Sequence, residues 1–186
     1  MSRRAVPKAD YHPPPSITRR ELLVDGSDLE FRRLIYRLVL VEERLRHART
    51  FLGRQAGLTG PQYMMLMSVA YLQGKTGIAV SVLAKELRVT SAFITGESRH
   101  LIESGLLGKK PNPLDSRSVL LSVTLAGRRR IEVLVPEVRT VNDLFFGRVS
   151  AESFRDAVRF LDELIDGSGL AISFISHREG RHLGRR

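Results

Sequence analysis

Small, polar and basic side chains recur at helical spacing between Thr90 and Arg99. If this stretch is a helix capped by Thr90 or Ser91, the residues that face inward are Ile94, Ser98, Leu101 and Ile102. The residues left outside are Ser91, Ala92, Thr95, Gly96 and Arg99. Short side chains let a helix enter a DNA major groove about 12 Å wide, where hydroxyl and guanidinium groups can bond to base edges. The chemistry that this strip suits is the reading of double-stranded DNA.

Gly96 is an unexpected residue inside that helix, because glycine costs about 1 kcal/mol there relative to alanine. Two features could compensate for this cost: a close approach of the helix to DNA, or packing of the helix against the hairpin that follows. The neighbouring Glu97 can accept a hydrogen bond from a cytosine amino group, or it can form an ion pair with a basic side chain such as that of Arg88 or Lys109.

A shorter helix is predicted just before this one. Val82, Leu83 and Leu87 supply its apolar face, Ser81 can cap it, and a turn over residues 88–90 leads into the next helix. Together they form a helix-turn-helix.

A β-hairpin is predicted after the second helix. Residues 118–124 alternate with period two, and the side chains predicted to face inward are those of Val119, Leu121 and Val123. The partner strand covers residues 106–111 and carries Lys109; the turn-rich tip between the strands carries Asp115 and Arg117. A basic tip beside a DNA-reading helix suits phosphate contact or insertion of Arg117 into a minor groove. The fold class is therefore mainly α with a small β-wing: a winged helix-turn-helix plus a helical dimerisation region.

An ordered series of short motifs resembles the MarR family of transcriptional regulators over residues 29–166. The residues that carry the likeness are Leu58, Thr59, Pro61, Gln62, Tyr63, Leu83, Ala84, Thr95, Leu101, Gly105, Leu106, Asp115, Ser116, Arg117 and the run from Leu121 to Gly127. The resemblance implies homodimers that bind palindromic operators and release DNA when a small ligand binds or a thiol is oxidised. It also implies that Arg117 enters the minor groove, that Asp115 braces the wing, and that residues 78–80 add a third strand.

The resemblance further implies an effector pocket where the first, second and fifth helices meet. At that junction the sequence offers Tyr36, Arg37, Tyr63 and Met67. Aromatic and thioether walls with one guanidinium suit a phenolic or aryl acid, or its thioester. Ordinary core and surface roles for these four residues remain the alternative.

Composition limits the remaining classes of function. The chain of 186 residues has no cysteine, which excludes disulfides, thiolate metal sites and a thiol-based response. No apolar run approaches the roughly 20 residues of a membrane span. Residues 1–20 lack a signal-peptide core, so a cytoplasmic location is expected.

The net charge of +10 is unevenly distributed. Residues 1–20 carry +4 and residues 177–186 carry +3, while residues 88–130 carry +5 and residues 131–166 carry −4. A basic reading surface with an acidic helical end is typical of a protein that docks one face on a phosphate backbone.

Three parts are expected. Residues 1–27 form an extended, basic, proline-rich arm that either contacts phosphate or is simply solvated. Residues 28–166 form the MarR-like domain, in which the dimerisation helices 28–52 and 125–166 flank the winged helix-turn-helix 59–124. Residues 167–186 form a C-terminal segment and basic tail, after Gly167, Ser168 and Gly169 end the last helix.

Local signals set the outer helices. Asp28, Thr59, Thr124 and Ser150 can each cap a helix, and Pro136 should bend the one that contains it. Their apolar stripes have no partner nearby in the chain, which favours a second subunit.

The predicted function is that of a homodimeric, ligand-responsive regulator of transcription, most simply a repressor. A sequence-tolerant architectural or nucleoid protein driven by the basic tails is the alternative. An enzyme is not expected, since no catalytic arrangement or phosphate loop stands out, and no cofactor is implied. The pairs Glu43 with His47 and His177 with His182 lack the further ligands that a metal needs.

Overall fold

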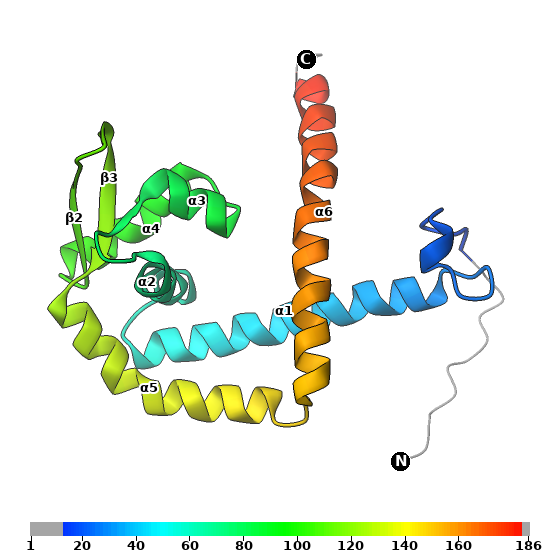
Figure 1. Cartoon of the computed structure of the whole chain (residues 1–186), viewed down its shortest axis with the longest axis horizontal. Helices are drawn as coiled ribbons and strands as arrows, with labels where there is room; N and C mark the ends of the chain where they lie inside the picture. The colour runs from blue at the N-terminus through cyan, green and yellow to red at the C-terminus, as the bar shows by residue number, and fades with distance from the viewer. Residues whose placement is uncertain (1–12, 184–186) are drawn as a thin grey trace. The chain divides into compact units, whose positions relative to one another are not determined.

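The computed structural model describes residues 13–183, in two compact units that divide after Pro136. The first unit holds the 3₁₀ turn η1 (Arg20–Leu22), α1 (Leu29–Gln55), α2 (Gly60–Leu72), β1 (Ile78–Ala79), α3 (Val80–Leu87), α4 (Ser91–Glu103), β2 (Leu107–Asn112), β3 (Asp115–Val123) and the start of α5 (Leu125–Phe146) (Figure 1). The rest of α5 and α6 (Ala151–Leu183) make the second unit. The predicted fold class is confirmed. Within residues 13–183, none of the helices combines the length and apolar character that crossing a bilayer requires.

The wing is a three-stranded antiparallel sheet in the order β1-β3-β2. Pro111 pairs with Val119 in its outer part, and the register shifts just beyond, between Pro111 and Asn112. The prediction that Val119 faces the interior is wrong: Val119 is 39% exposed, whereas Leu120 on the other face is 8% exposed. The reason is β1, because Leu120 pairs with Ala79 and is covered there, while Val119 lies beyond the buried base of the ribbon.

Helix α2 is the centre of the first unit. Its Met65, Leu66 and Val69 are at most 1% exposed, and the helix contacts α1, α3, α4 and β3. The predicted cap is confirmed: the Thr59 hydroxyl accepts from the Gln62 nitrogen at 3.3 Å, and the Gln62 side chain accepts from the Thr59 nitrogen at 3.0 Å. This capping box fixes where the buried helix starts.

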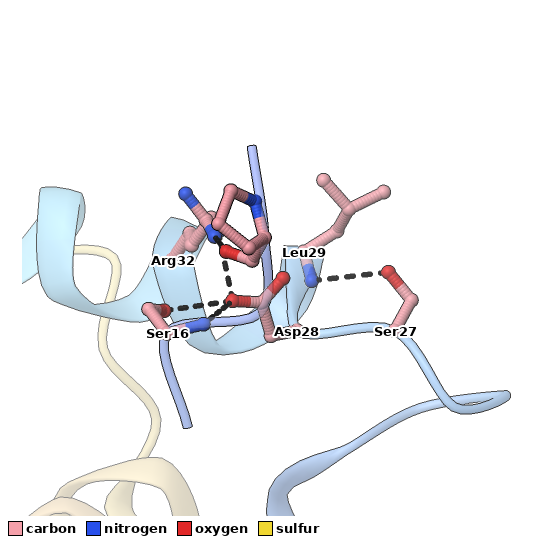
Figure 2. A network of polar contacts seen from close by, with 6 residues as sticks. Ser16, Ser27, Asp28, Leu29 and Arg32 are labelled. Atoms are coloured by element: carbon pink, nitrogen blue, oxygen red, sulfur yellow. Dashed lines mark hydrogen bonds and ion pairs between the residues drawn. The ribbon is translucent and has the colours of Figure 1, made fainter. Parts of the chain in front are cut away.

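Asp28 precedes α1, but its side chain does not cap the helix, so that prediction is wrong. Its Oδ2 accepts hydrogen bonds from the Ser16 nitrogen at 2.6 Å, the Ser16 hydroxyl at 2.7 Å and Arg32 Nε at 2.8 Å (Figure 2). Arg32 also donates to the carbonyl oxygen of Pro14. The bonds from Ser16, with the help of Arg32, hold the pKa of Asp28 below its ordinary value. Part of the predicted arm is thus fixed to the start of α1, while its residues 1–12 lie outside the described part.

The C-terminal helix is longer than predicted. Gly167, Ser168 and Gly169 do not end it, and α6 continues to Leu183. Neither glycine adopts a positive φ, unlike Gly105, which follows α4 at φ +72°. Without a left-handed residue there is no turn to satisfy the last carbonyls, so the chain keeps its helical hydrogen bonds at about 1 kcal/mol per glycine. Helix α5 likewise runs through Pro136 as one element.

Candidate nucleic-acid interface

Helix α4 presents the strip that the spacing predicts. Ile94 and Leu101 are 0% exposed and Ser98 is 3% exposed. The residues on the opposite side are all exposed, and they are Ser91, Ala92, Thr95, Gly96 and Arg99. The Thr90 hydroxyl caps the helix by accepting from the Phe93 nitrogen at 3.1 Å. The strip therefore lies on the surface, and its contact with DNA stays a prediction.

Gly96 faces open space. A Cβ atom built on it would meet no atom within 4 Å. Packing against the wing is therefore not what requires glycine here. Close approach of the helix to DNA stays a prediction.

The turn between α3 and α4 is formed by a residue in an uncommon conformation. Helix α3 starts after Ala79 rather than after Ser81, because β1 leads directly into it. It ends at Arg88, whose φ of 55° and ψ of 40° are left-handed. An arginine in this region is disfavoured because its Cβ crowds the following carbonyl. Sequence reasoning located the turn but missed exposed Arg88 as a surface candidate, since residue type gave no sign of the conformation.

The wing tip is held by its own polar side chains. Asn112 Nδ2 donates to Ser118 Oγ at 2.8 Å, and Asn112 Oδ1 accepts from the Leu114 nitrogen at 3.0 Å. Asp115 Oδ1 accepts from the Arg117 nitrogen at 3.0 Å, and the Ser118 hydroxyl donates to the Asp115 carbonyl oxygen at 3.1 Å. Asp115 thus braces the backbone while Arg117 is exposed. Asn112 and Ser118 were missed, although an asparagine in a turn-rich tip is a known signal of such bracing.

Cations outnumber carboxylates on α3, the turn that follows it, α4 and the wing. The exposed cations of α3, α4 and the wing are Lys85, Arg88, Arg99, Lys109, Lys110 and Arg117. The carboxylates on the same elements are Glu86, Glu97, Glu103 and Asp115. The excess of cations suits a phosphate backbone.

Comparison with known proteins bears directly on this interface. No family model matches the chain. The chain is 27% identical over 135 residues to the transcriptional activatory protein BadR of Rhodopseudomonas palustris, a match that covers 72% of this chain and 77% of BadR. The crystal structure of MarR is 25% identical with a TM-score of 0.53, covering 69% of this chain and 94% of that one. The S. aureus MepR–DNA complex is 17% identical with a TM-score of 0.61, and the match covers 71% of this chain and 96% of the MepR chain.

In sequence and in fold the chain is similar to proteins of the MarR family. It is accordingly a DNA-binding winged helix-turn-helix regulator of transcription and not an enzyme.

Two contacts join the reading head, which comprises residues 78–123, to the helices on either side. Gln73 Oε1, just after α2, accepts a hydrogen bond from the Val123 nitrogen at 2.8 Å. The Thr124 hydroxyl donates to the Gly105 carbonyl oxygen at 2.6 Å and accepts from the Gly127 nitrogen at 3.0 Å. Thr124 therefore caps α5, as predicted, and also pins the end of α4. Sequence reasoning missed Gln73, because no local pattern marks a bond across 50 residues.

A cavity of about 350 Å³ lies against the first turn of α4. Its walls are Arg46, Arg49 and Thr50 of α1, Gly60, Pro61, Met64 and Met65 of α2, Leu87 of α3, Val89 of the turn and Phe93 of α4. Because Phe93 belongs to the first turn of α4, the cavity is bounded in part by α4 itself.

The four residues predicted for the effector pocket do not line this cavity. They are Tyr36 and Arg37, which are exposed on α1, half-buried Met67, and Tyr63, which is 7% exposed. A Cβ on Gly60 would lie 3.2 Å from the Thr50 hydroxyl, so α1 meets the start of α2 near Thr50. At 1.5 Å per residue Tyr36 lies about 20 Å farther along α1. Burial raises the pKa of Tyr63, as expected of a core phenol. In residues 13–183, no three His, Cys, Asp or Glu side chains group as a metal would need.

Proposed function

We propose that this regulator is a homodimer that recognises a palindromic operator by sequence and represses from it. The observation that carries the proposal is the exposed strip of α4 beside exposed Arg117 on one braced reading head. In such a head α4 enters a major groove and the wing reaches the adjacent minor groove. Two heads related by a two-fold axis then match half-sites about one helical turn apart.

A second copy is the partner that the outer helices need. All described side chains of α6 are exposed in the single chain. The apolar stripe among them consists of Phe154, Val158, Leu161, Ile165, Ile172 and Ile175. One helix cannot bury such a stripe by itself. The proposed dimerisation region therefore comprises residues 28–52 and 125–166, extended along α6 toward Leu183.

The proposed effector is an aryl carboxylic acid bound in the cavity below α4. Met64, Met65 and Phe93 supply an apolar wall, and the guanidinium of Arg49 lies 3.9 Å from its carboxylate neighbour Glu42, a loose pair that a ligand carboxylate can replace. A ligand that displaces Phe93 shifts the start of α4. A ligand shifts the dimer toward the conformation that it binds more tightly. DNA is released if, in that conformation, the spacing of the two reading heads does not match the spacing of the half-sites.

Selection from a random-sequence duplex pool tests the proposal. The enriched sequences should contain inverted repeats with half-sites about 10 base pairs apart. Light scattering should give twice the chain mass of 20.9 kDa. A monomer that enriches nothing and binds with a steep salt dependence supports the second candidate, an architectural protein driven by the net charge of +10. A reporter downstream of the selected site distinguishes repression from activation, which is the role that BadR's name gives to that relative.

A further inference from the structure

The wing tip carries an apolar side chain at its most prominent position. Leu114 is 93% exposed, more than any other large apolar residue in the described part of the chain. It lies in the two-residue turn between β2 and β3, at the outer end of the ribbon, which projects beyond the helices (Figure 1). Such turns favour Gly, Asn, Asp and Ser for reasons of backbone geometry. The fold by itself therefore gives no reason for leucine here.

The tip holds Leu114 in place. Its nitrogen donates to Asn112 Oδ1 at 3.0 Å, and Asn112 is itself bonded to Ser118. Asp115 accepts from the Arg117 nitrogen, so the backbone on the other side is braced too. The side chains of Asn112, Asp115 and Ser118 are engaged within the tip, while that of Leu114 is exposed on an ordered backbone. An ordered contact of this kind loses little conformational entropy on binding.

The outer wing continues this apolar surface. Pro111 and Val119 face each other across the strands, and both are exposed, as is Pro113 beside Leu114. Exposed Arg117 lies on the same part of the ribbon. A narrow apolar ridge with a cation beside it matches the minor groove of DNA, where sugars form the walls and phosphates line the rims.

We infer that Leu114 is a specificity-determining residue, which packs into the minor groove beside Arg117 and selects against guanine at the base pair it covers. A G·C pair places the guanine 2-amino group in the minor groove, whereas an A·T pair offers only acceptors there. Leucine can desolvate that amino group but cannot accept its hydrogen bond. The inference rests on the proposed function and adds a base preference in the operator flanks.

The probes are duplexes that the wild-type protein selects from a random pool. The base pairs under both wings are set to A·T, to G·C or to inosine·cytosine. An inosine·cytosine pair has the same hydrogen-bonding groups as G·C in the major groove, but it lacks the 2-amino group in the minor groove. The wild-type protein should bind the A·T and inosine·cytosine duplexes alike and the G·C duplex at least about fivefold more weakly, the lower bound for one mismatched pair. In Leu114→Ala this ratio should fall below about twofold.

Two variants serve as controls. Leu114→Met keeps an apolar side chain and should retain the discrimination. Val82→Ala removes an exposed apolar group from α3 and should leave the ratio unchanged. A wild-type ratio in Leu114→Ala, or inosine·cytosine binding as weakly as G·C, overturns the inference while leaving the proposed function intact. Failure of the wild-type protein to select any duplex overturns both.

Discussion

The side-chain oxygen of Gln73 accepts a hydrogen bond from the backbone nitrogen of Val123 at 2.8 Å and so ties the end of α2 to the last strand of the wing. Val123 is 4% exposed, which leaves its nitrogen little access to solvent. Because β3 carries Arg117 near its other end, this one amide helps to hold the wing against the buried helix.

Replacing Gln73 with methionine should lower the free energy of unfolding by about 1–3 kcal/mol, since the buried Val123 N–H loses its acceptor. Urea denaturation measures the change. Gln73→Glu keeps an acceptor oxygen at neutral pH and should lose less. Equal losses in the two variants would show that the hydrogen bond is not the cause.

Gly96→Ala should separate stability from DNA binding. A Cβ at Gly96 meets no atom within 4 Å, so alanine should stabilise the helix by about 1 kcal/mol. If α4 approaches DNA closely at this point, the same methyl group should weaken operator binding. Thermal unfolding and a titration of the selected duplex measure the two effects. A more stable variant with unchanged affinity would show that the close-approach explanation is wrong.

Local patterns were enough to predict two helix caps and the exposed strip of α4. Thr59 and Thr124 cap their helices, and the strip from Ser91 to Arg99 is exposed, because each depends on neighbours a few residues away. The ends of longer elements depend on more. Glycine is common where a helix ends, but Gly167 lies inside α6. The helix continues because Gly167 does not adopt the left-handed conformation that would end it.

Long-range contacts explain the other errors. The carboxylate of Asp28 bonds to Ser16 instead of capping α1, and the choice between these partners depends on where the arm runs. The wall of the cavity includes Val89 and Phe93, which are far in sequence from α1. Tyr36 and Tyr63 do not line this cavity, because the helix on which a residue lies does not give its position along that helix. Their role in binding an effector stays a prediction.

Arg117→Ala should weaken binding to the selected duplex by about 1–3 kcal/mol and reduce the salt slope by about one, because the exposed guanidinium is the wing's candidate contact with DNA. A salt-dependent binding titration checks both. Arg148→Ala, which removes an exposed arginine from the second unit, is the matched control. Equal effects of the two substitutions would show that Arg117 contributes only through the net charge of the protein and makes no specific contact with DNA.

Asp28 should make the anchor of the arm sensitive to acid. Its folded pKa lies below the ordinary aspartate value of about 3.9, chiefly through the bonds from Ser16. The stabilisation is therefore fully present above that value and is lost as the pH falls through the folded pKa. The difference in urea midpoint between the wild-type protein and Asp28→Asn should be constant from pH 7 to about pH 5 and shrink below about pH 4. A difference that does not change with pH would argue that the two side chains differ only in packing.

Arg49 should make the cavity selective for anions. Benzoate should raise the melting temperature of the wild-type protein more than neutral benzamide does, because only benzoate can pair with the guanidinium. In Arg49→Met the two compounds should act alike, since the apolar wall of Met64, Met65 and Phe93 is unchanged. Arg46→Met is the matched control: Arg46 is bonded to Glu43 at 2.5 Å, and its removal should reduce the preference for benzoate less. If Arg49→Met keeps the full preference, the anion is bound elsewhere, and the cavity is an apolar gap below α4 rather than the effector site.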